Sequence, residues 1–172
     1  MTPPLVVVTV GTDHHPFTRL VTWFDHWMAR QGERVNAVVQ HGTAAPPRFG
    51  RAVAYLDHSE FLGLAASAQI VVCHGGPATI AECRRLGHVP IVVPRRPELG
   101  EHVDDHQLRF GGRLATKALA RVPRDEDELW TLLDAGVVDP MTYVLPSDGE
   151  RPVAATVRRF AELVAGLSER GR

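Results

Sequence analysis

Residues 69–94, QIVVCHGGPATIAECRRLGHVPIVVP, decide the fold of this chain. Residues 70–73 form a continuous apolar run, which is typical of a strand buried on both faces. Gly75 and Gly76 break the run, and Pro77 suits the first turn of a helix because its missing N–H leaves no hydrogen bond unmade there. Residues 91–93 are again apolar and β-branched. The stretch therefore predicts a strand, a tight turn, a helix and a second strand.

The glycine turn predicts an anion site. A glycine turn that opens a helix leaves free N–H groups and the positive end of the helix dipole directed at one point, where phosphate is the usual ligand. Many strand–helix turns contain glycine for packing reasons alone, so the turn by itself leaves both readings open. The dinucleotide fingerprint of three spaced glycines is absent, which argues against a nicotinamide or flavin enzyme.

The rest of the chain repeats the alternation of strands and helices. Apolar runs predict further strands at residues 5–10, 35–39, 52–56 and 119–122. Apolar spacing and capping residues predict helices from 16 to just before Gly32, from 57 or 59 to about 68, from 103 or 104 to 116, from 125 to about 133, and from about 150 to 170. This order predicts an α/β fold: one Rossmann-like domain over residues 1–172, with a mainly parallel sheet and helices on both faces.

Composition narrows the classes of function. Of the 172 residues, 44% are hydrophobic and 23% charged, which is ordinary for a globular protein. The net charge of -1 gives no bulk attraction to nucleic acid. No apolar run is long enough to span a bilayer, and the N-terminus reads as a strand rather than a secretion signal. Cys73 and Cys83 fit neither a metal spacing nor a redox pair, so we expect reduced, buried thiols in a cytoplasmic protein.

The candidate ligand residues follow predicted strands. Ligands of parallel sheets bind at the carboxyl ends of the strands, where Gly11 and Thr12, the turn at 74–76 and the loop at 95–106 should gather. There His74 can bond a phosphate oxygen and Thr79 can join it, while Glu82 can accept both hydroxyls of a ribose. The alternatives are a core-edge histidine, a helix cap and a carboxylate that interacts with the helix dipole.

The loop from Glu101 to Gln107 is rich in ionisable groups. Its donors are contiguous and cannot all converge, and an amide is a poor ligand for a transition metal, so we expect no metal site here. Two readings of this loop remain open: its side chains contact sugar hydroxyls, or they form the solvated start of a helix. The roles of His14 and His15 also stay open, and Arg95 and Arg96 could meet phosphate, a carboxylate or a partner.

Together these residues resemble a known family. HGGPATI, with Glu82 and then GHVPIVVP, resembles the donor-binding signature of glycosyltransferase family 28, C-terminal domain, which is the second half of two-domain GT-B transferases. VTVGTDHHPFTRLV and PRRPELGEHVDDHQ resemble the small catalytic subunits of bacterial capsular and exopolysaccharide transferases. Those subunits are similar to the catalytic subunit of the eukaryotic enzyme that adds the second GlcNAc to dolichol-linked GlcNAc. The resemblance covers residues 6–114.

The resemblance implies a role for each site residue toward a UDP-sugar. His74 and the turn at Gly75 and Gly76 would hold the diphosphate with help from Thr79, and Glu82 would hold the ribose. Gly11 and Thr12 would line the phosphate side of the cleft, and the backbone near Leu56 would bind uracil. His106 and Gln107 would contact the sugar, with Asp105 nearby. Pro77 departs from the small residue of the wider superfamily and removes one N–H from the turn.

The function implied is an inverting, metal-independent transfer of a hexose to a lipid-linked acceptor. His74 would stabilise the leaving group, and Asp13 or His14 would be the base. We expect a membrane-anchored, acceptor-binding partner subunit, contacted by the last helix and the flank at Trp23 and Trp27, that holds the chain at the inner face of the membrane. A homodimer is the alternative assembly. The alternative function is a non-catalytic nucleotide- or phosphate-binding module.

Overall fold

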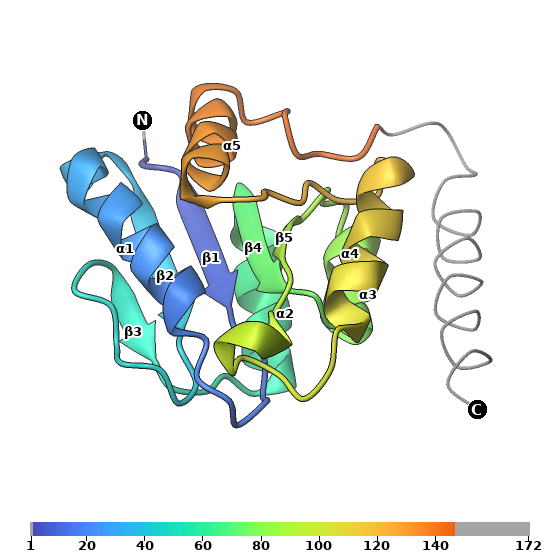
Figure 1. Cartoon of the computed structure of the whole chain (residues 1–172). Coiled ribbons are helices and arrows are strands. Elements are labelled where there is room, and N and C mark those ends of the chain that lie inside the picture. Colours follow the sequence, from blue (N-terminus) through green and yellow to red (C-terminus); the bar gives the residue numbers. More distant parts are fainter. Residues whose placement is uncertain (1, 147–172) are drawn as a thin grey trace.

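Five parallel strands form one sheet in the order β3-β2-β1-β4-β5 in the computed structural model of this protein, which describes residues 2–146. Figure 1 shows the sheet with its helices. The strands are β1 (Leu5–Thr9), β2 (Asn36–Gln40), β3 (Arg51–Val53), β4 (Ile70–His74) and β5 (Ile91–Val93). The chain places β2 and β3 on one side of β1, and β4 and β5 on the other. The carboxyl ends of β1 and β4 therefore flank a topological switch point, where such sheets bind ligands.

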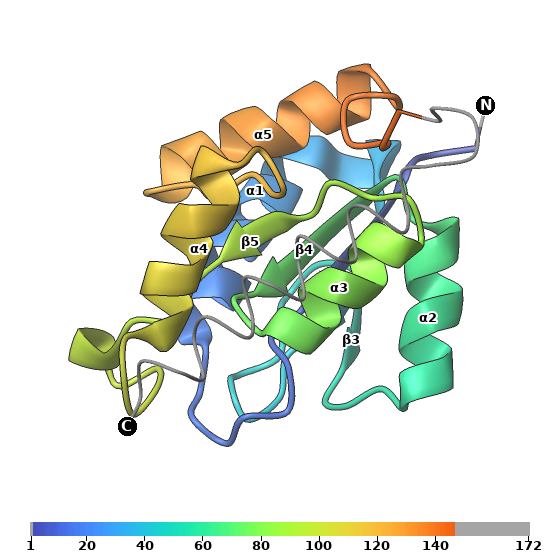
Figure 2. The ribbon, with the colours of Figure 1, turned by 90° about the vertical axis from the view of Figure 1, so that its right-hand side faces the viewer.

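Helices cover both faces of this sheet, as Figure 2 shows. The helices are α1 (Thr18–Gln31), α2 (His58–Ser67), α3 (Pro77–Arg85), α4 (His106–Thr116) and α5 (Glu126–Val138), with short 3-10 turns η1 (Gly32–Arg34) and η2 (Pro97–Leu99). Buried side chains of α1 and α5 pack with Val6 and Val8 on one face. Val7 faces the other side, where it packs with α2 and Cys83 of α3. This alternation along β1 confirms the predicted fold class.

Local signals place several helix boundaries where the sequence predicts them. Asp57 caps α2 by accepting from the N–H of Glu60, and the Glu60 side chain accepts from the Asp57 N–H in return. Asp125 caps α5 by accepting from the Glu128 N–H. The first helix ends at Gly32, whose φ of 60° lies in a region that costs glycine little.

Three expectations about segments need correction. Residues 119–122 form no strand, because only Arg121 pairs with Ile91 as an isolated bridge and the following proline has no N–H to continue the ladder. The third strand ends at Val53, and residues 54–57 lead to α2 instead. The helix expected from 103 or 104 begins at His106. The helix expected at about 150–170 lies outside the described residues.

The tryptophan flank is covered by this chain itself. Trp27 is fully buried, and its Nε1 donates to the Asp134 carboxylate of α5 at 2.8 Å. Trp130 of α5 in turn donates to the carbonyl oxygen of Trp23 at 2.9 Å. The prediction that this flank meets a partner is therefore wrong for Trp27, whose ring packs in the core.

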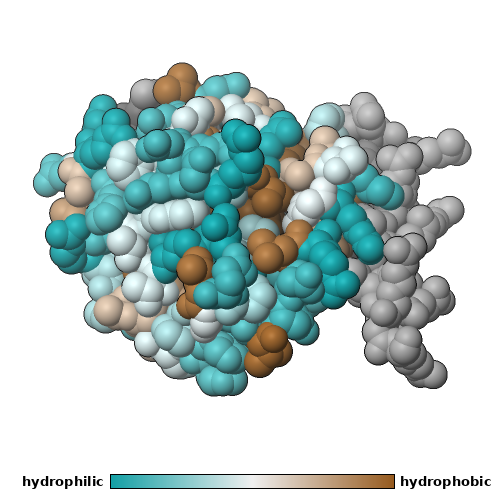
Figure 3. Space-filling model, viewed as in Figure 1, coloured by the Kyte–Doolittle hydropathy of each residue, from teal (hydrophilic) through white to brown (hydrophobic). Residues whose placement is uncertain are grey.

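Few large apolar side chains are exposed among residues 2–146. Hydrophilic residues predominate on the face in Figure 3, and hydrophobic ones form small separate patches. No helix among residues 2–146 is both long and apolar enough to cross a membrane.

Candidate functional site

A cleft of about 360 Å³ opens at the switch point between β1 and β4. Its size is within the range of small-molecule sites. Of the predicted ligand residues, those that line it are Gly11, Thr12, Leu56, His74, Gly76, Thr79 and Glu82. Sequence reasoning missed the lining residues Tyr55, Asp57, His58 and Phe61, which come from the approach to α2 and its first turns. The aromatic rings among them give one wall an apolar surface, whereas the turn after β4 is polar.

His74 is held in place by two glycines. A Cβ atom on Gly11 would lie 2.5 Å from its Cε1, and one on Gly76 would lie 2.2 Å from its Nε2, so side chains at both positions would displace the ring. Burial, with a further contribution from the charge of Arg95, lowers the pKa of His74 to about 4. The imidazole is thus neutral near pH 7 and adds no charge, and an anion would compete with the Thr9 backbone for its single N–H.

The N-terminus of α3 faces the cleft. No side chain caps this nine-residue helix, whose first turn contributes Pro77, Ala78 and Thr79 to the lining. Gly75 differs from the expectation: it is buried, does not line the cleft, and donates its N–H to Oε1 of Gln107 at 3.0 Å. The N–H groups that can face an anion are therefore those of Gly76, Ala78 and Thr79, because Pro77 has none and that of Gly75 is taken.

Glu82 lies one turn further along α3. Its side chain is 16% exposed, and one carboxylate oxygen lies 3.4 Å from Nδ1 of His58 and 3.9 Å from a guanidinium nitrogen of Arg85. His58 also lines the cleft, whereas Arg85 does not. A carboxylate in this position can accept hydrogen bonds from a diol, as the ribose prediction requires.

Gln40 shapes the cleft and was missed. It is 3% exposed and ends β2, where its Oε1 accepts from the Thr9 hydroxyl and from the N–H groups of Val10 and Gly11. Its Nε2 donates to the carbonyls of Gly11 and Ala54. A polar residue directly after the apolar run of a buried strand was the available signal.

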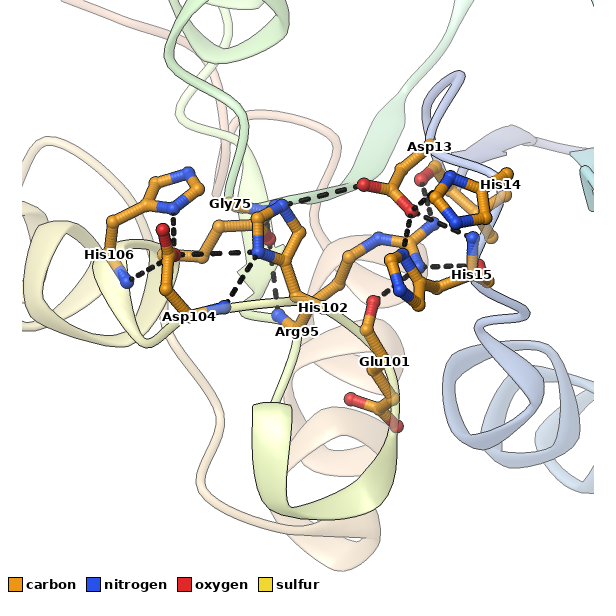
Figure 4. Close-up of polar contacts among 11 residues, drawn as sticks. Asp13, His14, His15, Gly75, Arg95, Glu101, His102, Asp104 and His106 are labelled. Atoms are coloured by element: carbon orange, nitrogen blue, oxygen red, sulfur yellow. Dashed lines mark hydrogen bonds and ion pairs between the residues drawn. The ribbon is translucent and has the colours of Figure 1, made fainter.

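A second polar cluster lies beside the cleft but does not line it. Figure 4 shows it running from His15 through Asp13 and His102 to Asp104 and His106. Nδ1 of His15 lies 2.6 Å from an Asp13 oxygen, and Nε2 of His102 lies 3.4 Å from the other. The charges of Asp13 and His102 both act on His74, so the cluster adjoins the turn after β4.

The remaining predicted residues belong to this second region. His14 is 84% exposed, with its Nδ1 4.0 Å from Asp13. Asp105 pairs with Arg109 one turn along α4, and His106 hydrogen-bonds to Asp104. Gln107 is 3% exposed, and its Oε1 accepts from the N–H groups of Gly75 and Arg95. Its oxygen is therefore occupied, and only its Nε2 remains for a sugar.

Arg95 joins the two loops that carry the cluster. Its side chain is fully buried and donates to the carbonyls of Val10, His15 and Glu101 at 2.7, 2.7 and 2.9 Å. The Glu101 carboxylate forms a two-pronged pair with Arg19. Burial lowers the pKa of Arg95, while the charges of Asp13 and Glu101 oppose that effect. Arg95 thus acts as a structural link and is closed to phosphate.

Two groups of three side chains bring possible metal ligands within 4.8 Å of one another. They are Asp13, His14 and His15, and His102, Asp104 and His106. In each group an imidazole nitrogen is already hydrogen-bonded to the carboxylate. We interpret both groups as hydrogen-bonded pairs.

The chain is therefore an α/β domain with a cleft at the switch point of its sheet, and the N-terminus of α3 faces that cleft. This chain belongs to glycosyltransferase family 28, C-terminal domain, because the sequence model of that family matches residues 5–143. The predicted family and the GT-B C-terminal fold are thereby confirmed. Its likeness to capsular and dolichol-pathway subunits stays a prediction.

Individual relatives agree with this assignment. The UDP-N-acetylglucosamine--N-acetylmuramyl-(pentapeptide) pyrophosphoryl-undecaprenol N-acetylglucosamine transferase of Sinorhizobium medicae (strain WSM419) is 25% identical over 112 residues, covering 64% of this chain and 30% of the relative. The chain thus spans less than a third of that protein.

Solved structures share the fold. MurG of Acinetobacter baumannii superposes with a TM-score of 0.57 at 17% identity, over 94% of this chain and 51% of MurG. The kitacinnamycin glycotransferase gives a TM-score of 0.62 at 17% identity, over 99% and 40% of the two chains. In both cases this chain corresponds to about half or less of the solved protein.

Proposed function

We propose that this chain is the donor-binding, catalytic subunit of an inverting, metal-independent glycosyltransferase. It moves a hexose from a UDP-sugar to a lipid-linked saccharide in polysaccharide biosynthesis. The observation that carries the proposal is the cleft at the switch point. It is lined by the neutral side chain of His74, by the uncapped N-terminus of α3 and by the carboxylate of Glu82. The curated relative is named for a UDP-sugar donor and an undecaprenol-linked acceptor, which supports the same substrate classes.

The reaction follows from this arrangement. The acceptor hydroxyl attacks the anomeric carbon from the face opposite UDP, so the configuration inverts. The negative charge that develops on the diphosphate meets the N-terminus of α3 and a hydrogen bond from His74, which do the work that a metal ion does elsewhere. Glu82 binds the ribose, and Tyr55 and Leu56 line the part of the cleft where the uracil ring would bind.

The described residues form one of the two halves that a GT-B transferase uses. The cleft residues come from one Rossmann-like sheet, whereas a GT-B transferase closes two such halves around its substrates, and this chain corresponds to 40–51% of the solved transferases described above. We propose a membrane-anchored subunit that binds the lipid-linked acceptor and holds this chain at the inner face of the membrane.

Reconstitution tests this function. The chain is co-expressed with a candidate partner subunit, and membranes are incubated with radiolabelled UDP-glucose, UDP-galactose or UDP-GlcNAc. We expect label in the lipid fraction only when both chains are present. Transfer by the purified chain alone would contradict the partner requirement. UDP binding without transfer in any pairing would favour a non-catalytic nucleotide-binding module.

A further inference from the structure

Asp13 and His15 form a close pair in the loop that follows β1. One Asp13 oxygen accepts from the backbone N–H of His15 at 2.7 Å and lies 2.6 Å from the Nδ1 of the same residue. The loop that holds them begins at Gly11, whose backbone packs against the His74 ring. The pair therefore follows directly on Gly11 and Thr12, the residues predicted to line the phosphate side of the cleft.

The pair specifies which His15 nitrogen carries the proton. Burial raises the pKa of Asp13, but the hydrogen bonds from His15 and the positive charge of Arg95 outweigh it, so the pKa lies below its ordinary value. An ionised carboxylate only accepts hydrogen bonds, so Nδ1 of His15 must donate. In the neutral ring, Nε2 then holds the lone pair. No described residue hydrogen-bonds to Nε2, and 23% of the side chain is exposed.

We propose that His15, held in this tautomer by Asp13, is the general base that deprotonates the acceptor hydroxyl; the proposal rests on the proposed transferase function. In the step, the acceptor O–H proton moves to Nε2, the oxygen forms a bond to the anomeric carbon, and the bond from that carbon to the diphosphate oxygen breaks. The leaving UDP takes the electron pair. The proton stays on His15 until it is released to solvent.

The geometry selects His15 over its neighbour. The sequence left Asp13 and His14 as candidate bases, but His14 is 84% exposed and its Nδ1 is 4.0 Å from the carboxylate. Asp13 instead orients His15, as the carboxylate does in an Asp–His pair of hydrolases. Arg95 fixes the same residue from behind by donating to its carbonyl oxygen at 2.7 Å. The base is thus pre-organised by two contacts that His14 lacks.

The charged and titratable groups around His15 come from three segments. The His14 ring lies 4.1 Å from the His15 ring, and the His102 ring lies 6.2 Å away on the neighbouring loop. Asp13 and Arg95 complete the set. Among residues 2–146, only Asp13 hydrogen-bonds to a ring nitrogen of His15, so its replacement should disturb the tautomer most.

His15→Gln and His14→Gln make a matched pair for the test. In the reconstituted system, we expect His15→Gln to lower turnover about 10²–10⁴-fold, the usual contribution of a general base. His14→Gln should stay within about twofold of wild type. Asp13→Asn should lower turnover at least about 100-fold by allowing the wrong tautomer. All three should bind UDP as wild type does.

Further measurements separate the possible failures. Equal effects of the two histidine variants, or full turnover by His15→Gln, would overturn the assignment of the base while leaving the transferase intact. Absence of UDP binding and transfer in the wild type would overturn the proposed function together with this proposal. Two-bond ¹⁵N–¹H spectra of the wild-type chain need no variant. A neutral His15 that carries its proton on Nε2 would contradict the mechanism.

Discussion

Replacing Arg95 by methionine removes the guanidinium that joins the two loops of the second cluster. Methionine fills most of the same buried volume but donates nothing to the carbonyls of Val10, His15 and Glu101. The chain then loses three charge-assisted hydrogen bonds, each worth about 1.5–3 kcal/mol. It also loses the contact of the guanidinium with the Phe17 ring, at 4.7 Å from the centroid.

The net cost is smaller than the sum of these contacts. The fully buried guanidinium carries a desolvation penalty, which the variant no longer bears, and its Nε is unpartnered among the described residues. Loss of one member of a buried charged network costs about 3–5 kcal/mol, and we expect a value in this range for Arg95→Met. Domains of this size have a total free energy of unfolding of about 5–15 kcal/mol, so the variant should still fold.

Urea unfolding followed by circular dichroism measures this cost. The matched control is Arg96→Met, because within the described part of the chain that side chain donates one exposed hydrogen bond, to the Arg124 carbonyl; its loss should cost less than about 1 kcal/mol. We expect Arg95→Met to keep UDP affinity and lose most turnover, because it loosens the loop of His15 and leaves the α3 turn intact. Equal midpoints for the two variants would refute the structural role of Arg95.

Three further predictions concern the cleft and its support. Gly76→Ala should displace His74 and weaken UDP binding at least about tenfold in calorimetry, whereas Gly112→Ala, where a Cβ meets no atom within 4 Å, should not. The unfolding free energy of wild type should fall as pH decreases from about 6.5 to about 4, because His74 takes up a proton in the unfolded chain and stays neutral in the folded chain. In His74→Asn the pH dependence of the unfolding free energy should be weaker over this range, and an unchanged slope would contradict the depressed pKa of His74. Gln107→Ala should lose about 1–3 kcal/mol of stability and most of its turnover but keep its affinity for free UDP. Equal losses of UDP affinity and turnover would contradict the assignment of Gln107 to the sugar.

The sequence predicted the parts of the site that depend on local pattern. The apolar run of β4, the glycines and Pro77 occur within a few residues of one another, so they reveal the strand, turn and helix directly. The rule that ligands bind at strand ends then brought Gly11, Thr12 and His74 to one edge, and the structure places all three on the cleft.

The connections between segments could not be predicted in the same way. The Arg95 side chain reaches the carbonyl of a residue 85 positions earlier, and Gln40 reaches Gly11 across 29 positions. Which polar side chain satisfies which buried backbone group depends on the three-dimensional approach of loops. For that reason Gly75 was expected to face phosphate, although its N–H is taken by a residue 32 positions away.

Calorimetry of UDP binding to the wild-type chain tests the central claim most directly. The titration is run with excess EDTA, with added Mg²⁺, and with inorganic phosphate in place of UDP. The cleft at the switch point predicts one UDP site per chain, the same affinity with EDTA and with Mg²⁺, and far weaker binding of phosphate because the walls from Leu56 and Glu82 are unused. UDP binding that is absent, or that disappears when EDTA is added, would contradict the account.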